Sequence, residues 1–169
     1  IRDSSTSYQA IEADKQFYVL SNLIKSALLL TYTPMAAYLL YDALYNDQWN
    51  NVRIRNLGVL YAIPDFVSLL LVKRMASSTV VHHIVVQLFA IFNFYADYTI
   101  DGIGRCIVVY AVFSTFAYLV NLLLASRFMN PTPRTSELIS LLALIIYTSC
   151  CFINWTWQCI YLKHLVQYH

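Results

Sequence analysis

Long apolar runs alternate with short polar turns along this chain, which is the pattern of a protein that crosses a membrane several times. Each run is near the roughly 20 residues that a helix needs to cross a hydrocarbon core of about 30 Å. The runs that predict transmembrane helices are Phe17–Tyr41, Leu57–Val72, Thr79–Tyr95, Cys106–Ala125 and Leu138–Leu162. The sequence therefore predicts an all-α, polytopic transmembrane helical bundle.

The number of spans depends on the last apolar run. It contains Asn154, Trp155 and Trp157, which could divide it into a span and an interfacial piece, so five or six spans are predicted. A polar N-terminal segment, residues 1–16, precedes one transmembrane domain, residues 17–169.

Composition supports the membrane interpretation. Hydrophobic residues make up 59% of the chain and charged residues 12%, against roughly 45–50% and 25% in a soluble domain. The formal net charge is +2 and no basic run is present, which argues against a nucleic-acid partner. A weak excess of Lys and Arg at the N-terminus and in the turns that contain Lys73, Arg74, Arg127 and Arg134 places the N-terminus in the cytosol or in a mitochondrial matrix.

Ionisable residues lie inside two neighbouring spans, in the stretch YAIPDFVSLLLVKRMASSTVVHHIVVQ. Asp65 lies midway along the first of these spans, and His82 and His83 lie in the first turns of the second. An ionisable side chain at mid-bilayer costs on the order of 3 kcal/mol, so it is by default a candidate functional residue. At about 1.5 Å per residue, Asp65 and the two histidines fall at a similar depth of roughly 12 Å.

Further polar side chains fall at a similar depth on the other spans, and together they predict a polar pocket within the membrane. Lys25 is the natural ion-pair partner of Asp65. A purely structural interpretation is also open. Each polar residue, taken singly, could form a hydrogen bond between helices, and the ion pair could be a structural salt bridge. The predicted lipid-binding residues are Asn22, Lys25, Ser114, Asn121 and Tyr147.

The histidine pair limits the chemistry of this pocket. Neighbouring helical residues are about 100° apart, so we expect that His82 and His83 cannot both face one small centre. The i, i+4 histidine pairing of a helical zinc site is missing, and no metal site is predicted. One histidine could instead act as a general base or nucleophile with Asp65 as its orienting partner, while the other fixes the helix. The predicted catalytic residues are His82, His83 and Asp65.

These residues resemble the TLC-domain family, which includes the ceramide synthases and several lipid-regulating relatives. The resemblance lies in the form YxxPDFxxLL followed by STVVHHIVV, and it extends to SNLIKSALLL and STFAYLVNLLLASRF. It implies a compact helical bundle around a lipid-accessible cavity. In ceramide synthases the paired histidines take part in acyl transfer from acyl-CoA to a sphingoid amine, so acyl-CoA is the implied substrate and no cofactor is expected. The second acidic cluster of those enzymes, HDxxD, is missing, because the corresponding region reads FYADYTIDGIGR.

Three functions follow as hypotheses. The chain could be an acyltransferase of lipid metabolism, a lipid-binding or lipid-sensing protein that does no chemistry, or a structural subunit built on a TLC-like scaffold in a larger membrane complex. Its expected partners are membrane lipids and, for the third hypothesis, other membrane protein subunits. The resemblance implies the endoplasmic reticulum, with the mitochondrial inner membrane as the alternative.

Overall fold

A computed structural model of the chain describes residues 9–73, 75–129 and 132–168. The first eight residues of the predicted polar segment, together with Arg74, lie outside this description. Within the described ranges the chain is all-α, as predicted, and it forms the helices α2 (Ala13–Tyr45), α3 (Asn51–Leu71), α4 (Ser77–Tyr95), α5 (Ile103–Thr115), α6 (Tyr118–Ser126) and α7 (Pro133–Tyr168).

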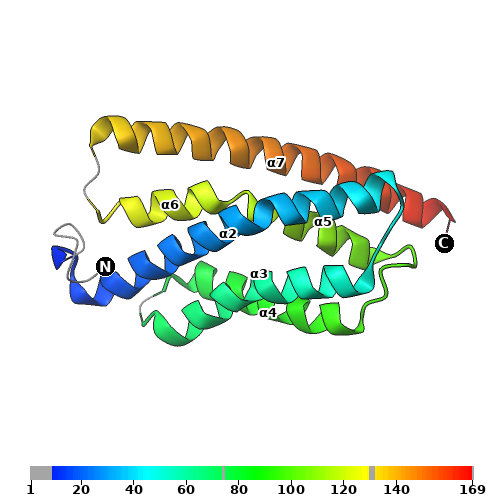
Figure 1. Cartoon of the computed structure of the whole chain (residues 1–169), viewed down its shortest axis with the longest axis horizontal. Helices are drawn as coiled ribbons and strands as arrows, with labels where there is room; N and C mark the ends of the chain where they lie inside the picture. Colours follow the sequence, from blue (N-terminus) through cyan, green and yellow to red (C-terminus); the bar gives the residue numbers. More distant parts are fainter. Residues whose placement is uncertain (1–8, 74, 130–131, 169) are drawn as a thin grey trace.

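The helices pack as an elongated bundle along one common direction (Figure 1). α3 and α4 pair with each other on one side, and α7 lies along the other side against α5 and α6. The long α2 contacts α3, α5 and α6 and so joins the two sides. α2 begins at one end of the bundle and α7 finishes at the other (Figure 1).

Four helices in the described ranges are long and apolar enough to cross a membrane, namely α2, α3, α4 and α7. The pair α5 and α6 passes the same test as a unit, so the structure supports four to five spans. The observed helices also extend beyond the apolar runs. α3, for example, begins at Asn51 rather than Leu57, because the side chain of Asn50 accepts a hydrogen bond from the backbone N–H of Arg53 and caps the helix.

The predicted fourth span is broken rather than continuous. α5 and α6 are bent by 44° relative to each other. Between them, Phe116 and Ala117 donate their backbone N–H groups to the carbonyls three residues earlier, which is the bonding of a tight 3₁₀ turn. The break contains neither proline nor glycine, and for that reason the sequence pattern does not reveal it.

The break around Asn154, Trp155 and Trp157 that the six-span alternative needs is absent, because α7 is continuous there. Asn154 is buried, and its side-chain oxygen accepts a hydrogen bond from Gln158 one turn later. Gln158 in turn donates to the backbone carbonyl of Cys106 on α5. These polar side chains attach α7 to α5 and leave the helix intact, so the described part of the chain shows no sixth span.

A polar cluster closes the end of the bundle away from the α3–α4 turn. Arg105 is buried, lies 4.5 Å from the centre of the Trp49 ring, and donates to the carbonyls of Tyr98 and Thr99. It also pairs with Asp101. Through these bonds the loop between α4 and α5 is attached to the loop between α2 and α3.

Candidate functional site

A cavity of about 360 Å³ lies inside the bundle, and residues from all six helices line it. Seven of the eight predicted site residues are among its lining, namely Asn22, Lys25, His82, His83, Ser114, Asn121 and Tyr147. The eighth, Asp65, is completely buried and contacts two of the lining residues, Lys25 and His83. The predicted polar pocket therefore corresponds to one observed cavity, while the role of each residue stays a prediction.

Helical spacing brings additional polar residues to the same cavity. On α2, Tyr18 and Ser21 precede Lys25 by seven and four residues and share its face. On α3, Tyr61 and Ser68 lie four residues before and three residues after Asp65. Sequence reasoning missed these four lining residues, although the spacing from Lys25 and Asp65 was available as a signal.

Asp65 is the centre of the ionisable cluster. Its carboxylate accepts a hydrogen bond from the ammonium group of Lys25, which confirms the predicted ion pair. Its Oδ1 atom lies 3.1 Å from Nδ1 of His83, and its Oδ2 atom lies 4.0 Å from Nε2 of His82. One carboxylate thus contacts groups from α2 and α4 and connects three helices.

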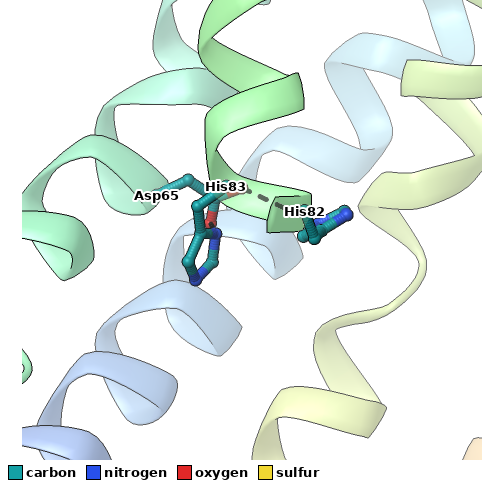
Figure 2. A group of neighbouring side chains, drawn as sticks. All are labelled: Asp65, His82 and His83. Carbon is teal, nitrogen blue, oxygen red and sulfur yellow. Dashed lines mark ion pairs between the residues drawn. The ribbon is translucent and has the colours of Figure 1, made fainter. Parts of the chain in front are cut away.

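The two imidazoles leave the first turns of α4 in different directions, and Asp65 reaches them from α3 (Figure 2). Their ring centres are 5.6 Å apart. The prediction that they cannot both face one small centre is wrong, because the carboxylate lies where ring nitrogens from both side chains can approach it. Neighbouring helical residues point about 100° apart, but both side chains are long enough for a ring nitrogen to approach the carboxylate from its own direction.

Burial separates the two histidines. The side chain of His83 is 8% exposed, whereas that of His82 is 47% exposed. His83 therefore acts mainly on its protein neighbours, and within the described residues its Nδ1 atom has no aligned hydrogen-bond partner. His82 is the imidazole that a molecule in the cavity could reach.

Asp65, His82 and His83 also have the composition of a small metal site. Each offers one ligand atom, and these atoms lie within 4.8 Å of one another. The ammonium group of Lys25 already occupies the carboxylate and places a positive charge where a metal cation would bind. A metal ion would have to displace Lys25, so the observed arrangement favours an ion pair with histidine neighbours over a metal centre.

The acidic residues of the region FYADYTIDGIGR lie outside this cavity. Asp97 accepts hydrogen bonds from Asn51 and from the backbone and hydroxyl of Thr99, and these bonds lower the pKa of its carboxyl. Asp101 pairs with Arg105. Both carboxylates therefore stabilise the loop before α5 and contribute nothing to the cavity lining.

Comparison of the chain with models of protein families, with curated proteins and with solved structures finds no match. The resemblance to the TLC-domain family accordingly stays a prediction that rests on the quoted sequence motifs. What the structure supports is a multi-span helical bundle with Asp65, His82 and His83 grouped at its centre.

Proposed function

We propose that this chain is a lipid-handling integral membrane protein that binds the polar part of a membrane lipid in the central cavity. The observation that carries the proposal is a cavity of about 360 Å³ whose lining gathers polar side chains from six helices of an otherwise apolar bundle. Small-molecule sites have volumes of about 300–1,000 Å³ and combine an apolar wall with a few polar groups. The cavity meets both criteria.

The apolar part of the lining supports a lipid rather than a small polar metabolite. Leu29, Phe113, Phe116, Val120 and Leu124 line the same space as Lys25 and His82. A lipid offers a polar head to the ionisable side chains of the lining and an acyl chain to its apolar side chains. A fully polar ligand would leave these apolar walls without a complementary surface.

The test is to fill the cavity. Val120 lies on α6 in the cavity wall, so Val120→Trp would occupy the space of a ligand. The matched control is Leu144→Trp on α7, where the native side chain is 64% exposed on the outside of the bundle. We expect native mass spectrometry and lipid extraction to find bound lipid in the wild type and in the control, and little in Val120→Trp.

Equal lipid content in all three proteins would contradict the proposal. A wild type that holds no lipid but purifies with a constant set of membrane proteins would support the structural-subunit hypothesis instead.

Acyl transfer is the second candidate function, and the exposure of His82 favours it. Its Nε2 atom lies 4.0 Å from a buried carboxylate, while nearly half of the side chain is open. Such an imidazole can take the proton of an acceptor hydroxyl or amine as that atom attacks the thioester carbonyl of an acyl-CoA. The imidazolium is then stabilised by Asp65 and returns the proton to the leaving thiolate.

Turnover assays separate binding from catalysis. If His82 is the base, His82→Ala keeps the bound lipid and loses acyl transfer from acyl-CoA, whereas His164→Ala, at a histidine that does not line the cavity, keeps both. Acyl transfer that persists in His82→Ala would exclude this role.

A further inference from the structure

We infer that the cavity selects a lipid with an uncharged, hydroxyl-bearing head group and disfavours both phosphate and ammonium head groups. This inference rests on the proposed function, because it names the class of lipid that the same cavity binds. Two independent properties of the lining support it: its charge balance and the direction of its hydrogen bonds.

The charges of the cavity are already balanced. Lys25 is the one Lys or Arg side chain in the lining, and no carboxylate lines it, within the ranges that the structure describes. The positive charge of Lys25 is paired with Asp65, which is completely buried. An anionic head would therefore compete with Asp65 for Lys25, and a cationic head would find no accessible carboxylate, so either charge would be buried without a partner.

Three polar side chains of the lining, those of Asn22, Ser114 and Asn121, each use a donor on their own helix. Asn22 donates one of its two amide N–H groups to the carbonyl of Tyr18 at 2.8 Å, and Asn121 donates one of its two to the carbonyl of Ala117 at 3.0 Å. Ser114 donates its hydroxyl to the carbonyl of Tyr110 at 2.8 Å. Among the described residues, no hydrogen bond reaches the side-chain oxygens of Asn22 and Asn121, which remain as acceptors.

The hydroxyl of Ser21 also uses its proton within the protein, in a hydrogen bond to the hydroxyl of Ser68. Ser68 donates its one hydroxyl proton to the carbonyl of Pro64. The hydrogen bond between Ser21 and Ser68 must therefore use the proton of Ser21. Ser21 also lines the cavity, where its oxygen can only accept.

The lining thus presents acceptor oxygens from α2 and α6 beside the ammonium group of Lys25 and the imidazole of His82, so the complementary head group is one that both donates and accepts. A hydroxyl group donates without bringing a charge into the membrane, and its own lone pairs can still accept from other lining groups. Ester, ether and phosphate oxygens offer acceptors only, so they leave the acceptors of the cavity unpaired.

Four lipids with the same oleyl chain and different heads test the inference. Oleyl alcohol carries a hydroxyl, oleyl methyl ether carries an acceptor only, and oleylamine and oleate are charged at pH 7.5. Each is titrated into delipidated wild-type protein and followed by native mass spectrometry. We expect the alcohol to bind about fivefold to tenfold more tightly than each of the others, which is the effect of one or two hydrogen bonds.

Variants of one lining residue identify the source of the preference. Asn121→Leu removes an acceptor and should bring the affinity for the alcohol close to that for the ether. Asn121→Asp adds an unpaired carboxylate and should shift the preference toward oleylamine. Asn56→Leu is the matched control, because Asn56 is exposed on α3 and does not line the cavity.

The outcomes separate the inference from the proposed function. If the alcohol and the ether bind equally well, or if oleate or oleylamine binds best to the wild type, the inference is overturned while lipid binding stands. If none of the four lipids binds, the proposed function is overturned as well.

Discussion

Removing one charge of the Lys25–Asp65 pair should destabilise the protein by very different amounts, depending on which charge is removed. Asp65 is completely buried and has three cationic or potentially cationic neighbours, Lys25, His82 and His83. Lys25 is 9% exposed, and Asp65 is its one carboxylate partner among the described residues. We compare Lys25→Met with Asp65→Asn, since each removes one charge and keeps a similar side-chain volume.

The asymmetry follows from the partners that each variant leaves behind. In Lys25→Met the carboxylate of Asp65 keeps the imidazole of His83 at 3.1 Å and that of His82 at 4.0 Å. In Asp65→Asn the ammonium group of Lys25 keeps no carboxylate among the described residues, so we expect a loss of about 3–5 kcal/mol, the usual cost of breaking a buried pair.

The assay is thermal unfolding in detergent, followed by circular dichroism, for the wild type, both single variants and the double variant. At about 2–4 °C per kcal/mol for a chain of this size, Asp65→Asn should lower Tm by about 10 °C and Lys25→Met by about 3 °C. The double variant should be more stable than Asp65→Asn alone, because it no longer buries an unpaired ammonium group. Equal losses in the two single variants, or additive losses in the double variant, would refute this account.

Two further predictions concern packing away from the cavity. In Gly58→Ala the new Cβ would lie 2.7 Å from the side-chain nitrogen of Asn93, so we expect overpacking to lower the free energy of unfolding by about 1–3 kcal/mol. The control is Gly102→Ala, which should leave Tm unchanged because no packing neighbour among the described residues lies within 4 Å of its new Cβ. An unchanged stability in Gly58→Ala would contradict the observed contact. Arg105→Lys should lower the free energy of unfolding by about 3 kcal/mol in the same assay. Lysine cannot keep two charge-assisted hydrogen bonds of about 1.5 kcal/mol each and also cover Trp49. A loss below about 1 kcal/mol, as is usual for exposed ion pairs, would show that Arg105 does not stabilise the loops.

The sequence was sufficient to predict the helical class and seven of the residues that line the cavity. Apolar runs of membrane-spanning length mark the helices, and an ionisable residue inside such a run is unusual enough to identify the site. Depth along each run then brought Lys25, Asp65 and the two histidines to one level, and the structure places Lys25 against Asp65 and the histidines beside it. The organelle and the TLC-domain resemblance were predicted from motifs alone and stay predictions.

The features that the sequence pattern missed depend on contacts between helices. The turn at Phe116 and Ala117 carries no helix-breaking residue, while the uninterrupted α7 contains the polar Asn154. In both places a side chain bonds to the backbone of a neighbouring helix: the hydroxyl of Ser26 on α2 donates to the carbonyl of Tyr118 beside the break, and Gln158 on α7 donates to the carbonyl of Cys106 on α5. Hydropathy along one segment contains no information about such partners.

The ion pair links the stability of the bundle to the ligand that the cavity accepts. Lys25 alone would attract an anionic head group, and an exposed Asp65 would attract a cationic one, so the neutrality of the cavity belongs to the pair rather than to either residue. Asp65 itself is completely buried, so among the members of the ionisable cluster only Lys25, His82 and His83 line the cavity. A head group that approaches Lys25 therefore meets an ammonium group whose charge is already paired with Asp65. The same arrangement that makes Asp65 costly to remove leaves the amide and hydroxyl oxygens of the lining to distinguish between lipid head groups.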